Sequence, residues 1–250
     1  MIRRECAIFL AAVTYFTRIR IPWIQVHSEE LLNKATRYFP MIGWIVGGFA
    51  ALIFWLAVQV WPVTVAVLIS TVASILLTGA FHEDGWTDMC DAFGGGWTKD
   101  QILSIMKDSR IGAYGTIGIV LILGIKVIAL SEMPVHWIPL VLIAGHSMSR
   151  LAATFQIYLL TYVRENEDSK SKPIAKKMTL QELVFAVVTG FLPLFLMPSF
   201  AWVILPMAVA WCVMSRIFVK KIGGYTGDCL GATQQICETV FYLGCLAGTR

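Results

Sequence analysis

Hydrophobic residues form long runs along this chain, and short polar segments separate the runs. Several runs approach the roughly 20 apolar residues that a helix needs to cross a bilayer. The pattern predicts an all-α fold, a polytopic integral membrane helical bundle with about six to seven spans and a single domain over residues 1–250. The runs lie at residues 41–61, 63–80, 112–130, 137–162, 181–197 and 200–219, with a shorter one at 236–248.

The N-terminal segment carries an apolar piece from Cys6 to Phe16 with arginines on both sides. It resembles a signal peptide superficially, but no small-residue cleavage site follows it. We expect an uncleaved interfacial or re-entrant helix that Pro22 ends.

Composition and charge placement support a membrane protein and orient it. The chain is 57% hydrophobic and 14% charged, with a mean hydropathy of +0.71, outside the range of ordinary soluble domains. Basic segments of membrane proteins face the cytoplasm. We therefore expect a bacterial cytoplasmic (inner) membrane protein whose active site lies on the cytoplasmic face. The turns at 61–63, 131–136 and 197–200 lack Lys and Arg, whereas the N-terminal segment and the loops at 81–111, 164–179 and 220–235 hold nearly all of the twenty.

The most acidic stretch, residues 82–96, points to a metal site. On a helix, Asp84, Asp88 and Asp91 fall at i, i+4 and i+7 and share one face. Stacked like charges repel, so a cation is expected between them, and hard oxygen ligands favour Mg²⁺, with Mn²⁺ as the alternative, over Zn²⁺. A solvated acidic helix end is the competing interpretation. Asp108 is a candidate fourth ligand, and His82 and Glu83 are weaker candidates.

Other positions suggest phosphate binding, each with a structural alternative. Glycines 94–96 can present N–H groups to an anion or simply end a helix. Exposed cations can hold phosphate or form a local ion pair. An arginine within a span is a functional candidate or pairs with a carboxylate of the bundle. The candidates are Gly94, Gly95, Gly96, Lys107, Arg110, Arg150 and Asp228 of a glycine-rich segment, which is otherwise a bare turn.

Two further residues of the spans allow more than one interpretation. Gly85, within the acidic helix, permits either a close ligand approach or helix packing. Lys126 is expected to snorkel toward the external membrane surface. Acidic ligands, glycines and scattered cations on one face together indicate phosphoryl or phosphodiester transfer, in which the protein mainly positions groups and neutralises charge.

The motifs resemble those of the cobalamin synthase family, the adenosylcobinamide-GDP ribazoletransferases. The likeness rests on residues 82–91, the glycines 94–96 and the block 105–115, and extends to residues 39–43 and 223–232. It implies attack of a ribose hydroxyl of α-ribazole or its 5′-phosphate on the cobinamide-bearing phosphorus of adenosylcobinamide-GDP, with loss of GMP. It also implies Mg²⁺ on the Asp84/Asp88/Asp91 face, with one aspartate accepting the hydroxyl proton.

The expected partners are these two substrates and the lipid bilayer, with no nucleic acid. Self-association and association with other corrinoid-pathway enzymes stay open. Two other classes compete. A CDP-alcohol phosphotransferase expects an Ala-Arg pair soon after its first Asp-Gly, where this chain has Trp86-Thr87-Asp88. An ion or metal transporter would carry carboxylates at bilayer depth in several spans, whereas these acids cluster at one face.

Overall fold

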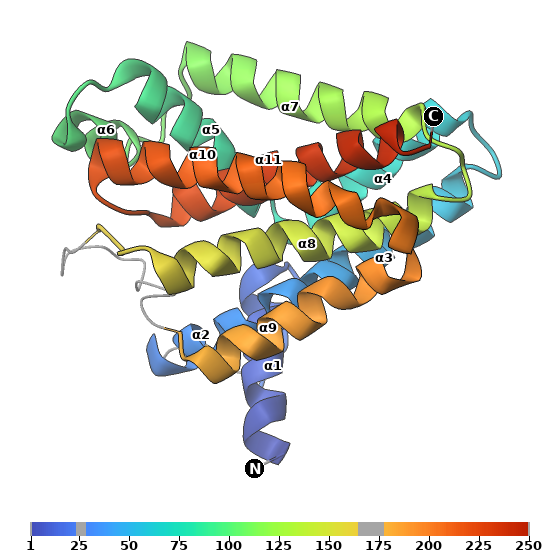
Figure 1. The fold of residues 1–250 in the computed structure, drawn as a ribbon, viewed down its shortest axis with the longest axis horizontal. Coiled ribbons are helices and arrows are strands. Elements are labelled where there is room, and N and C mark those ends of the chain that lie inside the picture. Colours follow the sequence, from blue (N-terminus) through green and yellow to red (C-terminus); the bar gives the residue numbers. More distant parts are fainter. Residues whose placement is uncertain (1, 24–28, 165–177, 250) are drawn as a thin grey trace.

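The computed structural model describes residues 2–23, 29–164 and 178–249, and within these ranges the regular elements are helices (Figure 1). The helices formed by the apolar runs, together with the acidic helix α5, pack side by side as one bundle. They are α3 (Phe39–Ala57), α4 (Val63–Thr78), α5 (Phe81–Gly95), α7 (Ala113–Ser131), α8 (Ile138–Leu159), α9 (Leu180–Phe191), α10 (Ile204–Ile222) and α11 (Gly227–Ala247). The remaining elements are α1 (Ile2–Phe16), α2 (Glu29–Ala35), α6 (Lys99–Ile105) and the 3₁₀ turns η1 (Thr36–Tyr38), η2 (Leu192–Leu196) and η3 (Pro198–Val203).

The helix lengths and compositions identify an integral membrane protein and confirm the predicted all-α fold class. Four helical stretches in the described residues are long and apolar enough to cross a membrane, and the bent pair α4–α5 makes a fifth. This count is below the predicted six to seven, because α9 is short and α11 carries many buried polar side chains. Large apolar side chains such as Leu121, Leu205 and Val209 are exposed on the outer helix faces, where lipid would cover them.

A sharp break separates α4 from the acidic helix α5. Gly79 and Ala80 both adopt left-handed backbone conformations, with φ of 69° and 59°. Glycine enters this region freely, whereas a residue with a Cβ does so rarely. The two left-handed residues turn the chain by 90° between the helices. As a result α5 runs alongside α7 and α11 instead of continuing the line of α4.

Small residues let the central helices approach closely. Gly43 and Gly47 lie four residues apart on the face of α3 that meets α8, and a Cβ at either position would clash with the α8 backbone at His146 or Ile143. Small residues at this spacing are the usual means of close helix packing in membranes. The pair α3–α8 forms the centre of the bundle.

The connecting segments gather at two ends of the bundle. The turns after α3 and α7 lie at one end, together with the C-terminus, while the α6–α7 and α10–α11 connections lie at the other (Figure 1). At this second end the backbone N–H of Val163 donates to Tyr225 and that of Tyr225 donates to Thr161, at 3.0 and 2.9 Å. The structure thus confirms that polar segments distant in sequence converge. Most of the predicted basic loop at 164–179 lies outside the described residues.

Helix α1 crosses the direction of the long helices (Figure 1). It packs on α2 and α3 through a cluster that includes Ile8, Ala12 and Phe16. A helix lying across the spans is the orientation expected of an interfacial segment. The interfacial or re-entrant placement of α1 stays a prediction.

Candidate active site

A polar cleft opens at the end of the bundle where the polar segments converge. Its cavity of about 240 Å³ is lined by α5, the start of α11 and residues from the end of α8 to Arg164, together with aromatic rings of α1 and α3. Asp84 and Asp228 face it with Arg164, whose Nη2 atom lies 2.8 Å from Oδ2 of Asp228. Residues from five separate segments therefore build one site that pairs carboxylates with a guanidinium.

Two glycines set the distance between the helices that carry these carboxylates. A Cβ on Gly85 of α5 would lie 3.0 Å from the carbonyl oxygen of Asp228, and one on Gly231 of α11 would lie 3.2 Å from that of His82. The two helices therefore cross at their glycines. This decides the role of Gly85 in favour of helix packing, and the close approach brings Asp84 and Asp228 to the same cleft.

The acidic stretch forms a helix, as predicted, and its aspartates share a face. Asp88 is half-buried and close enough to Asp84, Asp91 and Asp228 for their charges to act on it. Asp84 is exposed toward the cleft. The structure thus brings Asp84, Asp88 and Asp228 together, although Asp228 was assigned from sequence to a separate phosphate clamp.

Asp91 has a different environment from the other two. Its carboxylate accepts hydrogen bonds from the backbone N–H groups of Gly112 and Gly115, at 2.7 and 2.8 Å. These amides belong to the first turn of α7, where the helix end favours a negative charge. A Cβ on either glycine would collide with the carboxylate. Asp91 therefore joins α5 to the start of α7, and each of its carboxylate oxygens accepts one hydrogen bond there.

Asp108 lies beyond α6 and pairs with Arg110. The guanidinium of Arg110 donates to both carboxylate oxygens, with Nε–Oδ1 at 3.0 Å and Nη2–Oδ2 at 2.5 Å. These hydrogen bonds lower the pKa of Asp108 to about 2. Lys107 and Arg110 are exposed beside it. The local ion pair named as the structural alternative is thus present, and roles in binding metal or phosphate stay predictions.

The glycine run at the end of α5 is used in packing. Gly94 and Gly95 are the last helical residues, and Gly96 donates its N–H to the carbonyl of Ala92 at 2.9 Å. A Cβ on Gly94 would clash with the ring of Tyr114, and one on Gly96 with Ile102. Close packing therefore explains Gly94 and Gly96, whereas a Cβ on the exposed Gly95 would make only an ordinary contact with Ile105 at 3.6 Å; phosphate binding by the three glycines stays a prediction.

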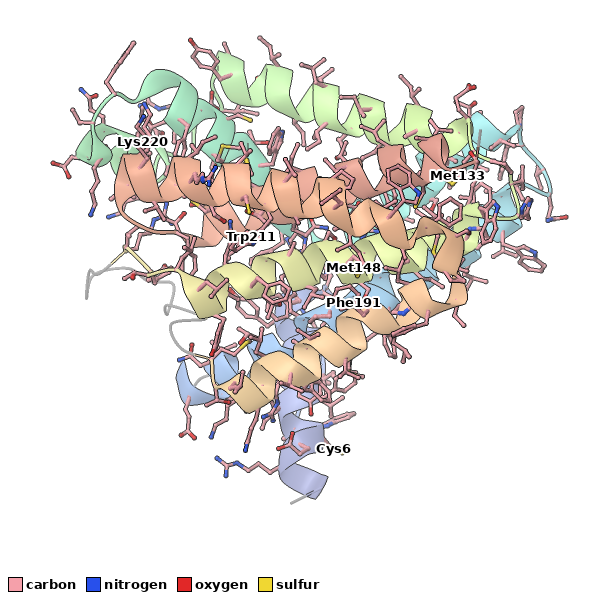
Figure 2. The ribbon with its side chains drawn as sticks, in the orientation of Figure 1. Cys6, Met133, Met148, Phe191, Trp211 and Lys220 are labelled. Carbon is pink, nitrogen blue, oxygen red and sulfur yellow. The ribbon has the colours of Figure 1, made fainter. Side chains whose placement is uncertain are left out.

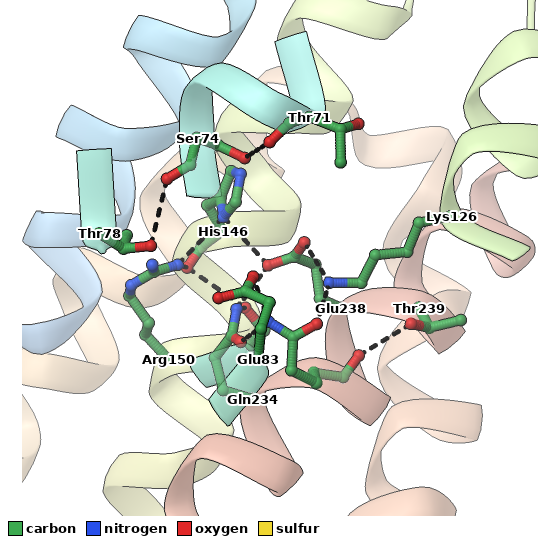
Figure 3. A network of polar contacts seen from close by, with 12 residues as sticks. Thr71, Ser74, Thr78, Glu83, Lys126, His146, Arg150, Gln234, Glu238 and Thr239 are labelled. Atoms are coloured by element: carbon green, nitrogen blue, oxygen red, sulfur yellow. Dashed lines mark hydrogen bonds and ion pairs between the residues drawn. The ribbon is translucent and has the colours of Figure 1, made fainter. Parts of the chain in front are cut away.

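A network of charged side chains lies buried between α5, α7, α8 and α11 (Figure 3). Glu238 is at its centre. One carboxylate oxygen accepts a hydrogen bond from Nζ of Lys126 at 2.8 Å, and the other lies 3.0 Å from Nδ1 of His146 and 2.5 Å from Nε2 of Gln234. Lys126 also donates to Gln235 at 2.6 Å. The prediction that Lys126 snorkels to the membrane surface is wrong, because a carboxylate inside the bundle binds it.

The same network holds Arg150 and Glu83. Arg150 is 1% exposed, and its Nη1 atom donates to the carbonyl of His146 at 2.9 Å. Gln235 donates to Glu83 at 2.9 Å, which turns Glu83 away from the aspartate face. Arg150 is thus buried among protein groups with its hydrogen bonds directed to His146, and its contact with a substrate phosphate stays a prediction. His82 is also buried and stacks on Phe39 with ring centroids 5.7 Å apart.

The donor set can be compared with what a magnesium ion requires. Across the described parts of the chain, no three His, Cys, Asp or Glu side chains are grouped closely enough to hold an ion by themselves. Magnesium is usually bound in proteins by one or two carboxylates together with waters and substrate phosphates. Asp84 and Asp228, which line the cleft, and Asp88, which lies close enough for their charges to act on it, fit that mode but not an all-protein site.

The sequence analysis missed Arg164 at the cleft, and it missed Glu238 with its two glutamines in the buried network. Arg164 was treated as the start of a polar loop, although it faces the cleft. Glu238 and its two glutamines were placed in a final apolar helix, residues 236–248 or just before it. A carboxylate within an apolar segment is itself a signal of a buried partner. Glu238 lies in such an apolar segment, and Lys126 had been singled out as a charged residue of another span.

Fold and cleft together define a polytopic helical membrane protein with a polar, acidic site at one end of its bundle. Residues 8–246 match the family model described as cobalamin-5-phosphate synthase (CobS), and the chain belongs to this family. A protein from Shewanella frigidimarina named adenosylcobinamide-GDP ribazoletransferase is 43% identical over 98% of this chain and 95% of its own. One of the same name from Shewanella oneidensis is 44% identical over 96% and 93%. No solved structure matches the chain.

Proposed function

We propose that the chain transfers the adenosylcobinamide-phosphate group from adenosylcobinamide-GDP to α-ribazole or its 5′-phosphate and releases GMP, late in cobalamin biosynthesis. Membership of the family and the names of relatives that cover nearly the whole chain support this transferase activity. The same match favours it over the phospholipid-enzyme and transporter alternatives. The convergence of Asp84, Asp228 and Arg164 on one cleft is the structural observation that carries the proposal.

The reaction forms one phosphorus–oxygen bond and breaks another. A ribose hydroxyl attacks the phosphorus that bears cobinamide, the bond to the bridging oxygen breaks, and GMP leaves with the electron pair. Arg164 is placed to bind phosphate oxygens, since a guanidinium holds them at two points. Its ion pair with Asp228 keeps it directed into the cleft before substrate binds. One aspartate of this cluster accepts the hydroxyl proton, and Asp84 is the member exposed to the cleft.

We propose Mg²⁺ as the cofactor, with Mn²⁺ as a substitute, held by Asp84 and Asp88 with substrate phosphates completing the shell. When bound, the ion neutralises phosphate charge and stabilises the leaving group. The aspartates supply the hard oxygen ligands that this ion prefers. We also propose that the cleft faces the cytoplasm of the bacterial inner membrane, since the segments that build it are the ones rich in Lys and Arg.

The test is GMP release by the purified protein in detergent with adenosylcobinamide-GDP, α-ribazole phosphate and Mg²⁺. Asp84→Asn and Arg164→Met should each lower the rate at least about a hundredfold, the order found when a charge-stabilising group is removed. Asp100→Asn is the matched control, because Asp100 is an exposed carboxylate in the first turn of α6, outside the cleft lining.

The possible outcomes distinguish an error in the proposed function from an error in the proposed site. If the unaltered protein releases no GMP in the complete mixture, the proposed function is wrong. If it does so and Asp84→Asn remains as active as Asp100→Asn, the function holds but the site lies elsewhere. Mn²⁺ binding, followed by electron paramagnetic resonance, should weaken in Asp84→Asn and remain unchanged in Asp100→Asn. Equal binding by both variants would exclude Asp84 as a ligand.

A further inference from the structure

An apolar groove runs along the outside of the bundle between α8, α9 and α10. Its cavity of about 260 Å³ is lined by residues including Leu151, Phe155, Phe191 and Met207. A second cavity of about 550 Å³ continues from it along α10, and Trp211 and Cys212 line both. The two cavities therefore form one continuous groove on the surface of the bundle. Figure 2 labels Met148, Phe191 and Trp211 on its three helices.

The groove exists because α10 packs against α11 and makes few contacts with α8. Two side-chain hydrogen bonds bridge the gap to α8, from Nε1 of Trp211 to the carbonyl of Ala152 at 2.9 Å and from Nε2 of Gln156 to Oγ of Ser215 at 3.2 Å. These bonds hold the groove open at a defined width. Exposed apolar side chains of α10 such as Leu205 and Val209 indicate that this face of the helix meets hydrocarbon, so an acyl chain can occupy the groove.

Charge at one end of the groove selects among lipids. Arg216 and Lys220 line the second cavity mainly with the apolar parts of their side chains, lie one helical turn apart on α10 and are exposed. Within the described ranges neither forms an ion pair. Basic pockets between membrane helices bind anionic lipid headgroups. The groove therefore has an apolar part and, next to it, an unneutralised cationic part.

The dimensions of the groove fit a single leaflet. From Ile204, where the lining of the groove on α10 begins, to Arg216 the helix rises about 18 Å, close to the thickness of one leaflet with its headgroup boundary. One half of the hydrocarbon core of a bilayer is about 15 Å thick. A lipid whose phosphate lies at Arg216 would therefore place its acyl chain along the whole apolar part. The match holds whichever leaflet contains this end of α10.

We propose that this groove is a binding site for one anionic phospholipid, with the phosphate at Arg216 and Lys220 and an acyl chain between α8 and α10. Each cation near a membrane surface contributes about 1 kcal/mol of attraction to an anionic lipid. Two cations predict about thirtyfold tighter binding of phosphatidylglycerol than of phosphatidylcholine. The site is separate from the acidic cleft, so the proposal does not rest on the enzymatic activity.

Native mass spectrometry of the detergent-solubilised protein tests the preference, with phosphatidylglycerol and phosphatidylcholine added in turn. The unaltered protein should retain phosphatidylglycerol about thirtyfold more strongly. The double variant Arg216→Gln/Lys220→Gln should retain both lipids equally. Lys221→Gln is the matched control, because Lys221 is exposed on the same helix turn but lines neither cavity. Equal retention by the unaltered protein, or an equal loss in the control, would overturn the proposal.

The native thiol of Cys212 reports whether the lipid lies in the groove. In a Cys6→Ser background, which removes the other exposed thiol, a bilayer-soluble maleimide should modify Cys212 more slowly when the nanodisc contains phosphatidylglycerol. An unchanged rate would place the lipid elsewhere and refute the site. A disulfide-linked dimer through Cys212, formed regardless of lipid, would instead show that a second copy covers the groove and would also refute it.

Discussion

The buried carboxylate of Glu238 provides a demanding test of how this bundle is held together. It is 3% exposed and is bonded to Lys126, His146 and Gln234. With Arg150 and Glu83 the network holds two permanent cations and two carboxylates, so its formal charges sum to zero when His146 is neutral. Glu238→Gln keeps the shape of the side chain and removes one charge. It leaves Lys126 without its anionic partner.

The expected cost follows from burial. Removing one partner of a buried ion pair destabilises a protein by about 3–5 kcal/mol, because the remaining charge is left uncompensated. We therefore expect Glu238→Gln to lower the free energy of unfolding by this amount. Lys126→Met should cost a similar amount, since it leaves a carboxylate uncompensated. The double variant removes both charges and restores neutrality, so it should be about 1–3 kcal/mol more stable than the two single losses predict by addition.

The assay is unfolding of the detergent-solubilised protein by sodium dodecyl sulfate, followed by circular dichroism, for the unaltered protein, both single variants and the double variant. Glu132→Gln is the matched control, because Glu132 is an exposed carboxylate at the end of α7. A loss for Glu238→Gln no larger than that of the control would refute the reasoning. So would strict additivity of the two single variants, because it would mean that Lys126 and Glu238 do not stabilise one another.

Three other substitutions test the local arguments. Asp91→Asn should lower the free energy of unfolding by about 1–3 kcal/mol, because an amide N–H₂ would face a backbone N–H of α7; denaturation with the same detergent measures this. Gly85→Leu should abolish both stable folding and activity by separating α5 from α11, whereas Gly48→Leu should be tolerated, since open space surrounds Gly48; retained activity of Gly85→Leu would contradict the crossing. With the pKa of Asp108 lowered to about 2, its pair with Arg110 is fully formed above about pH 4 and is lost as the pH falls through 2. The pH profile of GMP release between pH 5 and 8 should therefore have the same shape in Asp108→Asn, and a shifted limb would show that Asp108 titrates in the reaction.

Local patterns were sufficient for the elements and for part of the site. The apolar runs predicted the long helices, and the spacing of Asp84, Asp88 and Asp91 predicted a shared helix face. Charge placement predicted that the polar segments gather at one end. Each of these is a property of neighbours along the chain, because helical periodicity and the polarity of a connection are set within a few residues.

Which helices meet was decided by tertiary structure. Lys126 and Glu238 are 112 residues apart in sequence, and they pair only because α7 and α11 pack together. Arg164 reaches Asp228 because backbone hydrogen bonds join their two connections. A sequence shows that a buried charge needs a partner of opposite charge, but it does not show which residue is that partner. The partner depends on which helices pack together, and glycines such as Gly85 set how closely they approach. The packing of the helices therefore decides which carboxylates face the cleft and which neutralise cations inside the bundle.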